Sequence, residues 1–290
     1  MNRSQMELIV KISETGSFTK AGEELNMTQP AVSRAVATFE SQLGTKLIIR
    51  SKKNGIIFTD IGERILILFR NILDQFVKVD ELISLEKGLE IGKIRIGGYP
   101  TACTNFIPQI IRVMKEEHPN LEISLHEGSV DEVREWLRSR IIDVGIIIPP
   151  NEEFDIVPLV KDEFVIVIGK DHPLSRTEKI CLKDITEEDM LLVKGGYEIP
   201  IYNLFEEAGL KLNVKFAVHH LDTALSMANE GLGFVITTNR SILFLPDNCV
   251  VRKLETEVRR EVNIAAVSFN ESSNIVNYFI KTAKDIFSNT

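Results

Sequence analysis

Gln29, Ser33 and Arg34 lie in one short stretch and carry side chains that can bind nucleic acid. A glutamine can pair with adenine, an arginine can bind guanine or a phosphate, and a serine hydroxyl can bind either. The three residues follow Thr28, a natural helix cap, and Pro30 falls in the first turn, where a helix needs no amide donor. The stretch therefore predicts a helix whose exposed N-terminal end enters the major groove of DNA.

A second helix is needed to hold this one in place. Ser17 is expected to cap it, ahead of Phe18, Ala21 and Leu25 at helical spacing. Asn26 is expected to end it, because asparagine tolerates a left-handed backbone. Two helices joined by so short a turn make a helix-turn-helix. The alternative is an ordinary surface hairpin of helices whose polar face is merely solvated.

Residues 47–50 and 55–58 are two β-rich runs joined by a polar turn that ends in Asn-Gly, a strong signal for a β-hairpin. Arg50, Lys52 and Lys53 lie on this hairpin, which would act as a wing along the phosphate backbone. The predicted DNA-binding residues are Ser17, Thr28, Gln29, Pro30, Ser33, Arg34, Arg50, Lys52 and Lys53.

The stretch from Gly16 to Gly62 resembles the N-terminal domain of LysR-type transcriptional regulators. The matching elements are Gly16 to Thr19, Ala21-Gly22, Leu25, Gln29 to Ser33, Phe39-Glu40, Leu43-Gly44, Leu47 to Arg50 and Thr59 to Gly62. Two positions depart from the family pattern. Gly22 replaces the usual second alanine, which costs about 1 kcal/mol in a helix interior, and Ile48-Ile49 replaces a pair that usually contains phenylalanine.

The composition is that of a globular protein, with 44% hydrophobic and 26% charged residues in 290. The net charge of −8 argues against general coating of nucleic acid, but the charge is uneven. Residues 1–60 hold 8 Lys and Arg against 6 Asp and Glu, a net charge of +2, so the rest of the chain carries −10. A mildly basic module on an acidic body favours selective binding through a small surface.

Neither a signal peptide nor a membrane span is expected, since the apolar runs are short and interrupted. Three widely spaced cysteines fit neither a disulfide framework nor a metal site, and they favour a cytoplasmic location.

Three regions are expected: a winged helix-turn-helix domain at 1–60, a linker helix and hinge at 61–91, and a region at 92–290 that the resemblance implies is an effector-binding domain. Asp60 is expected to cap the linker helix, which should run to about Lys87. Its apolar positions follow a heptad rhythm, which favours a seam between helices. The alternative is a helix packed on its own chain. The resemblance implies a homodimer through this helix, and a homotetramer built from two dimers.

From Lys93 onward, expected strands alternate with helices, which predicts an α/β fold with a largely parallel sheet. This half resembles the effector-binding region of the same family, which is built like a periplasmic binding protein. The matching elements are Ile96-Gly97, Ile107-Pro108, His118-Pro119, Glu127-Gly128, Asp143 to Ile146, Pro158-Leu159, His172 to Leu174, Leu182 to Asp184 and Gly231 to Gly233. The resemblance implies subdomain I at 92–162 and 267–290, and subdomain II at 163–266. Thr237-Thr238-Asn239 departs from the family's Leu-Pro.

An effector is expected in the crevice between the two subdomains, at the ends of the strands. Thr101 is the first candidate, because it lies near the start of a helix, where free amides and hydroxyls can bind an anion. A small carboxylate is accordingly the candidate effector. The predicted effector-binding residues are Tyr99, Thr101, Thr104, Ser129, Ile148, Pro149, Gly195, Tyr197, His220 and Thr223. For each one, loop capping or packing is the plain alternative.

No catalytic residues, metal ligands or cofactor motifs emerge from the sequence, so we expect a protein that is not an enzyme. The expected function is regulation of transcription by sequence-specific binding to a double-stranded DNA operator, controlled by a small-molecule effector. RNA polymerase is a candidate partner. Two alternatives remain at this stage. One is a redox-sensing regulator that acts through Cys103, and the other is a cytoplasmic solute-binding α/β protein.

Overall fold

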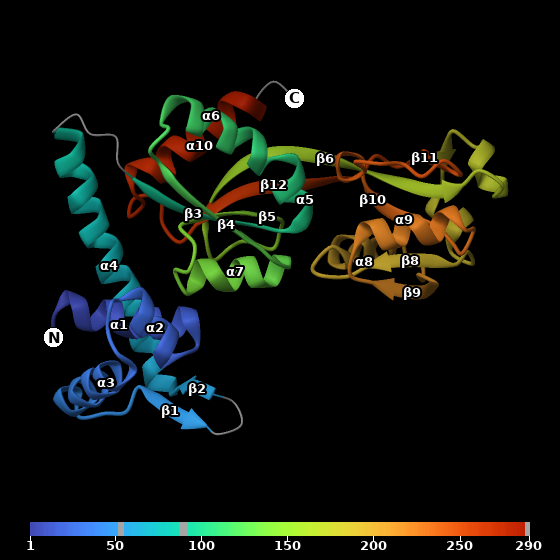
Figure 1. Ribbon diagram of the computed structural model, residues 1–290. Helices are drawn as coiled ribbons and strands as arrows, with labels where there is room; N and C mark the ends of the chain where they lie inside the picture. Colours follow the sequence, from blue (N-terminus) through green and yellow to red (C-terminus); the bar gives the residue numbers. More distant parts are fainter. Residues whose placement is uncertain (52–54, 87–91, 288–290) are drawn as a thin grey trace. The chain divides into compact units, whose positions relative to one another are not determined.

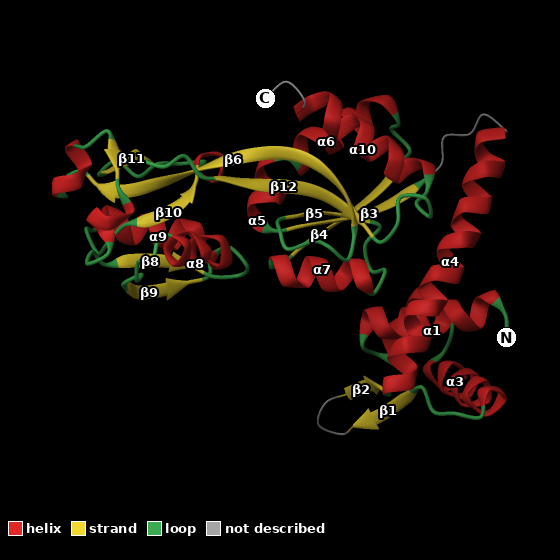
Figure 2. Ribbon diagram, turned by 180° about the vertical axis from the view of Figure 1, so that it is seen from behind, coloured by secondary structure: helices red, strands yellow, loops and turns green. Residues whose placement is uncertain are grey.

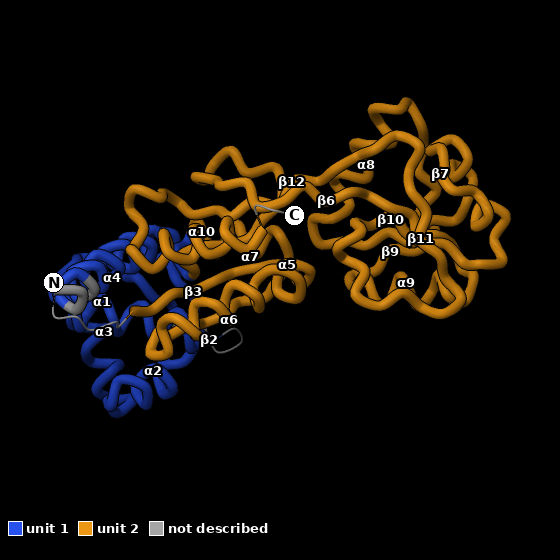
Figure 3. Tube along the Cα trace, turned by 90° about the horizontal axis from the view of Figure 1, so that it is seen from above, with its two compact units in different colours: residues 1–91, 139–141 blue, residues 92–138, 142–290 orange. Residues whose placement is uncertain are grey.

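The computed structural model describes residues 1–51, 55–86 and 92–287. The chain forms two compact units, one of Met1–Ile91 with Ser139–Ile141 and the other of Gly92–Arg138 with Ile142–Thr290 (Figure 3). Within the described ranges, no helix is long and apolar enough to cross a membrane.

The first unit contains a helix-turn-helix, a β-hairpin and a long helix (Figure 1). Its elements are α1 (Arg3–Thr15), α2 (Phe18–Glu24), α3 (Gln29–Leu43), β1 (Ile48–Ser51), β2 (Gly55–Phe58) and α4 (Asp60–Glu86). The expected hairpin is confirmed, with β1 and β2 paired antiparallel. The core forms where the apolar faces of α1, α2 and α3 meet, around Ile9, Phe18, Val32 and Phe39.

Ser17 caps α2 as expected, with its hydroxyl accepting a bond from the Lys20 amide at 3.3 Å. The expected cap of α4 was wrong by one residue. Asp60 is the first residue of the helix, and Thr59 caps it by accepting a bond from the Gly62 amide at 3.0 Å. Asp60 is still favourable there, because a negative side chain in the first turn interacts with the helix dipole.

A buried carboxylate connects α3 to the hairpin. Glu40 is 5% exposed, and one of its oxygens accepts bonds from the backbone amides of Leu47 at 2.9 Å and Ile48 at 3.0 Å. The other oxygen pairs with the ammonium of Lys46 at 2.7 Å. Burial alone would raise the pKa of Glu40, but the bonds from Lys46, Ile48 and Leu47 together lower the pKa below its usual value of 4.5. The charged carboxylate thus holds the start of the wing against α3.

The second unit alternates strands and helices (Figure 2). Its first part comprises β3 (Lys93–Gly98), α5 (Pro100–Asn105), α6 (Ile107–Glu117), β4 (Glu122–Glu127), α7 (Val130–Arg138), β5 (Val144–Ile147) and β6 (Asp155–Gly169). Its second part comprises η1 (Pro173–Arg176), β7 (Lys179–Ile180), η2 (Leu182–Ile185), β8 (Met190–Val193), α8 (Glu198–Glu207), β9 (Val214–Val218), α9 (Leu221–Asn229), β10 (Val235–Thr238), η3 (Asn239–Ser241), β11 (Cys249–Leu254), β12 (Arg259–Ala266) and α10 (Asn274–Phe287).

The expectation of a largely parallel sheet was wrong, because the sheet is mixed. Its strand order is β4-β3-β5-β12-β6-β11-β7, with β10 also paired to β6. β3 pairs in parallel with β4 and β5, whereas β12 runs antiparallel to both β5 and β6. The long strand β6 accounts for the difference: it passes from one half of the unit to the other, and β12 returns beside it in the opposite direction.

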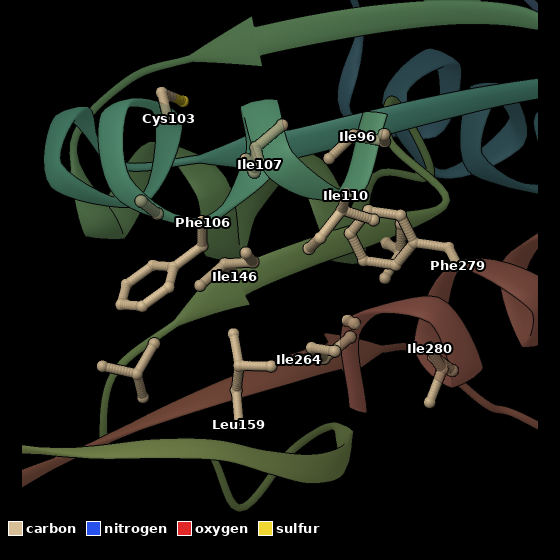
Figure 4. Close-up of a cluster of buried hydrophobic side chains, with 14 of the residues drawn as sticks. Ile96, Cys103, Phe106, Ile107, Ile110, Ile146, Leu159, Ile264, Phe279 and Ile280 are labelled. Atoms are coloured by element: carbon tan, nitrogen blue, oxygen red, sulfur yellow. The ribbon is translucent and has the colours of Figure 1, made fainter. Parts of the chain in front are cut away.

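The packing of the second unit divides at these two strands. One cluster joins β3, β5 and the start of β6 to α6 and α10, around Ile96, Phe106 and Phe279 (Figure 4). α6 and α10 lie side by side on one face of this sheet, and α7 covers the other (Figure 1). Two further clusters lie beyond, around Ile166 with α8 and around Val167 with α9. Successive residues of β6 therefore point to opposite faces, as strand geometry requires.

We predict that Glu40→Ala lowers the free energy of unfolding by about 2 to 4 kcal/mol, because two buried amides lose their acceptor. Glu40→Gln should lose less, since its amide oxygen can still accept. Urea denaturation measures both variants, and the exposed Glu23→Ala should change stability by less than about 0.5 kcal/mol.

The same bonds set a pH dependence. The pKa of Glu40 is lower in the folded state, so its contribution is complete above about pH 4.5 and is lost as the pH falls through the folded-state pKa. The stability difference between wild type and Glu40→Gln should shrink over that acidic range. A difference that stays constant with pH would contradict the role given to the charge.

Candidate DNA-binding surface and effector cavity

The N-terminal end of α3 presents a polar surface. Gln29, Pro30 and Arg34 are exposed, and Ser33 is half-buried. Gln29 and Ser33 are four residues apart, as are Pro30 and Arg34, so the four side chains form two neighbouring rows over the first helical turns. Val32 and Val36 face the other way and anchor the helix in the core. The sequence-predicted side chains are therefore together at one end of α3.

Two residues, Asn26 and Gly22, shape the turn before α3. Asn26 adopts the expected left-handed conformation, with φ of 55°. A Cβ atom at Gly22 would lie 2.5 Å from the carbonyl oxygen of Met27, which is too close for any side chain. Gly22, a departure from the family pattern, is thus required by the close approach of this turn. Thr28 occupies the N-cap position, but its side chain makes no capping bond.

The basic residues of the hairpin are only partly described. The backbone of Arg50 belongs to β1 and pairs with Ile56. Lys52 and Lys53 lie outside the described residues, so their assignment to DNA stays a prediction.

The second unit contains a cavity of about 130 Å³, lined by residues from both halves of the unit. It is bounded by Pro100, Thr101, Thr104, Phe164, Val193, Tyr197, Ile201, His219, His220, Leu221, Asp222, Ile236, Thr237, Ser241, Leu243 and Arg260. Four of the predicted effector residues therefore meet here: Thr101, Thr104, Tyr197 and His220. Tyr99 does not line the cavity, but it is fully buried and its ring lies 5.7 Å from that of Tyr197, which does.

The other predicted residues are not among those that line this cavity. Ser129 precedes α7, where its hydroxyl bonds to Glu132 at 2.9 Å. The carbonyl of Ile148 accepts a bond from Arg134, and Pro149 follows it in the chain. Gly195 accepts a bond from the Val130 amide. Thr223 is exposed on α9. Their assignment to the effector stays a prediction.

Sequence reasoning missed Arg260, the arginine that lines the cavity. Its guanidinium is buried, and its Nη2 donates to the hydroxyl of Thr238 at 3.1 Å. Of the two threonines that depart from the family's Leu-Pro, Thr237 lines the cavity and Thr238 accepts the bond from Arg260. In the sequence, the available signal for Arg260 was an arginine just before the apolar residues of β12. Its hydrogen bond to Thr238 becomes visible only in the folded structure.

The thiol of Cys103 is poorly suited to redox chemistry. It is buried, its Sγ donates to the carbonyl of Gly98 at 3.3 Å, and it does not line the cavity. Burial, and secondarily the nearby charge of Glu127, raises the pKa of Cys103 to about 12. A reactive cysteine needs the opposite shift, because the thiolate is the nucleophile. The part of the chain that the structure describes also contains no cluster of three or more His, Cys, Asp or Glu side chains able to hold a metal.

Comparison with known proteins covers both units. The family model "LysR substrate binding domain" matches residues 87–288, and "Bacterial regulatory helix-turn-helix protein, lysR family" matches residues 4–63. YvbU of Bacillus subtilis (strain 168), named as an uncharacterized HTH-type transcriptional regulator, is 45% identical over 289 residues, which is 99% of both chains. YoaU of the same organism, named in the same way, is 32% identical over 286 residues, again 99% of both.

Solved structures share the fold. A full-length, singly substituted OxyR from Pseudomonas aeruginosa gives a TM-score of 0.78 at 24% identity, covering 99% of this chain and 97% of that one. CbnR in complex with its target DNA gives a TM-score of 0.68 at 19% identity, covering 98% and 99%. The family models and the full-length relatives agree with the architecture described above: the chain belongs to the LysR family of DNA-binding transcriptional regulators, with an N-terminal helix-turn-helix domain and a C-terminal effector-binding domain.

Proposed function

We propose that the chain binds a specific operator through the N-terminal end of α3, and that a small molecule in the cavity of the second unit controls this binding. The observation that carries the proposal is the exposure of Gln29 and Arg34 at the start of a helix held by a buried core and a wing. Gln29 and Ser33 would bind base edges, and Arg34 a guanine or a phosphate. Arg50, Lys52 and Lys53 would bind the phosphate backbone from the wing.

We place the functional boundaries at 1–60 for DNA binding, 61–91 for dimerisation and 92–290 for effector binding. The separate cores on either side of the crossing strands support a further division into subdomain I, 92–162 with 267–290, and subdomain II, 163–266. An effector would act by binding one arrangement of these subdomains better than another.

Dimerisation through α4 is supported by its exposed apolar stripe. Leu68 is 58% exposed, Val79 53% and Leu82 60%, and they follow the heptad rhythm seen in the sequence. Apolar side chains exposed in a row on one helix indicate a partner surface. A homodimer would bring two α3 helices to two half-sites, and two dimers would make the tetramer. RNA polymerase is the further partner that we propose, and the cytoplasm the location.

The chain would act by binding and not by catalysis. The competing redox interpretation draws on relatives such as the "Hydrogen peroxide-inducible genes activator" of Haemophilus influenzae, which is 25% identical over 87% of this chain. The buried, high-pKa thiol of Cys103 argues against it. A plain solute-binding protein would not need the first unit.

We expect Arg34→Ala to weaken binding to the DNA upstream of the chain's own gene by about tenfold or more, because one base or phosphate contact is lost. Fluorescence anisotropy with scrambled competitor DNA, repeated over a range of salt concentrations, measures this. Arg112→Ala removes the same charge from an exposed site on α6 and should leave affinity unchanged. Equal losses in the two variants would mean that Arg34 contributes only charge, and no loss in either would remove α3 from the interface.

Leu68→Glu combined with Leu82→Glu should raise the dimer dissociation constant by about tenfold or more, because charges would be buried in an apolar seam. Analytical ultracentrifugation measures the change. Val77→Glu is the matched control, since Val77 is 38% exposed on the opposite side of the same helix. A dimer unaffected by the double substitution would place the interface elsewhere.

Hydrogen peroxide near neutral pH should leave both Cys103 and the affinity for DNA unchanged, because a thiol with a pKa of about 12 remains protonated there. Mass spectrometry after treatment tests this. Cys181→Ser is included because Cys181 is the more exposed cysteine. Oxidation of Cys103 together with altered DNA binding would revive the redox interpretation.

A further inference from the structure

Arg260 has fewer partners than its burial requires. Its side chain is 4% exposed, and a guanidinium carries five N–H donors. One of them reaches Thr238, but the closest carboxylate oxygen, on Asp162, is 4.0 Å from Nη2, beyond hydrogen-bond distance. Among the described residues, the Nε–H of Arg260 finds no acceptor. A buried guanidinium with an unsatisfied N–H lowers the stability of the fold unless another group accepts a hydrogen bond from it.

The groups around Arg260 supply little acceptor capacity. The rings of Tyr99, Phe164 and Tyr197 each lie 5.9 Å from its Cζ atom, so the cation is enclosed by aromatic faces. The hydroxyl of Tyr99 is itself buried, with no hydrogen-bond partner within the described ranges. Burial raises the pKa of Tyr99 to about 12, so the hydroxyl stays protonated and can donate. Two kinds of donor in this cluster therefore lack an acceptor.

Arg260 also lines the cavity, whose other walls define what can enter. Val193, Ile201 and Ile236 are apolar, while Thr101, Thr237 and Ser241 provide hydroxyls. The lining also holds the carboxylate of Asp222 and the imidazoles of His219 and His220. The volume of about 130 Å³ resembles that of cavities that hold a single benzene ring. A compact molecule with an apolar body and one charged end fits this lining.

We propose that Arg260 is the anion-recognition residue of the cavity and that its ligand is a compact monocarboxylate with an apolar body. The proposal deepens the proposed function, since it rests on the same cavity being the effector site. A carboxylate matches the planar fork of a guanidinium and supplies the missing acceptor. A single negative charge is favoured over a phosphate dianion, because Asp162 already brings a carboxylate to within 4.0 Å of the same guanidinium.

The position of Arg260 also connects the ligand to the two halves of the unit. Arg260 and Asp162 are opposite each other on β12 and β6, the strands that cross between the halves. Asp162 accepts a bond from the Arg240 amide at 3.3 Å, and the Arg240 carbonyl accepts one from Asn105 of α5 at 2.6 Å. A carboxylate bound to Arg260 would weaken the attraction between Arg260 and Asp162. Asp162 is also bonded to Arg240, which connects it to α5.

The test compares monocarboxylates, from propanoate to benzoate, with their uncharged amides on the full chain by isothermal titration calorimetry. At least one acid should bind saturably, and its amide should bind about tenfold or more weakly. Arg260→Gln should lower the acid's affinity by a similar factor. Arg252→Gln is the matched control: Arg252 lies in the same sheet and bonds to Ser175, but it does not line the cavity.

Asp162→Asn should act in the opposite direction and raise the acid's affinity several-fold, because it removes a competing negative charge. This variant and the acid–amide comparison on wild type keep the test decisive if Arg260→Gln does not fold. Equal binding of acid and amide, no binding of any acid at millimolar concentration, or binding of inorganic phosphate alone would each overturn the proposal. DNA affinity is measured on the same preparations, so a failure of operator binding is seen separately from a failure of carboxylate recognition.

Discussion

The charged, buried carboxylate of Glu40 is the interaction on which the geometry of the DNA-binding unit depends. A wing made of two four-residue strands has little core of its own, and isolated hairpins of that size are marginal in water. Glu40 compensates by accepting hydrogen bonds from the amides of Leu47, just before the first strand, and Ile48, its first residue. The helix that carries Gln29 and Arg34 and the hairpin that carries Arg50 therefore share one fixed point. The proposed contacts to bases and to phosphates would be spaced by this shared point.

The second unit depends on a different constraint, the pair of long strands β6 and β12. Because the chain crosses between the two halves on adjacent antiparallel strands, the apolar cores on either side stay separate while the backbone remains continuous. The cavity lies along this crossing, so its lining comes from segments as distant in sequence as Thr101, Val193 and Arg260. A ligand that interacts differently with the two halves would shift the balance between their arrangements.

The sequence predicted most local features, because these depend on neighbouring residues. Ser17 caps α2 through its own side chain, and Asn26 adopts the left-handed backbone expected of it. The features that were missed are long-range. The direction of β12 relative to β6, and the contact of Arg260 with Thr238, depend on residues far apart in the chain. Thr101 lies inside the short helix α5, whose six residues are too few for a periodic signal in the sequence. The need for glycine at position 22 appears only once Met27 is placed beside it.

The energetic cost of burying Arg260 with an N–H that no described residue satisfies suggests that this residue serves binding and not stability. A buried ion pair is often no more stabilising than apolar residues of the same volume, because desolvation offsets the attraction between the charges. The Asp162–Arg260 pair is weaker than most, with a separation of 4.0 Å and unsatisfied atoms on both side chains. Stability alone would favour aliphatic residues at these two positions. Local disagreement with the rules of packing is expected where a protein binds something else. Arg260 meets that description, because it lines a cavity and, among the described residues, its Nε–H has no acceptor. The same deficit that weakens the folded chain would make a carboxylate the ligand that stabilises it most.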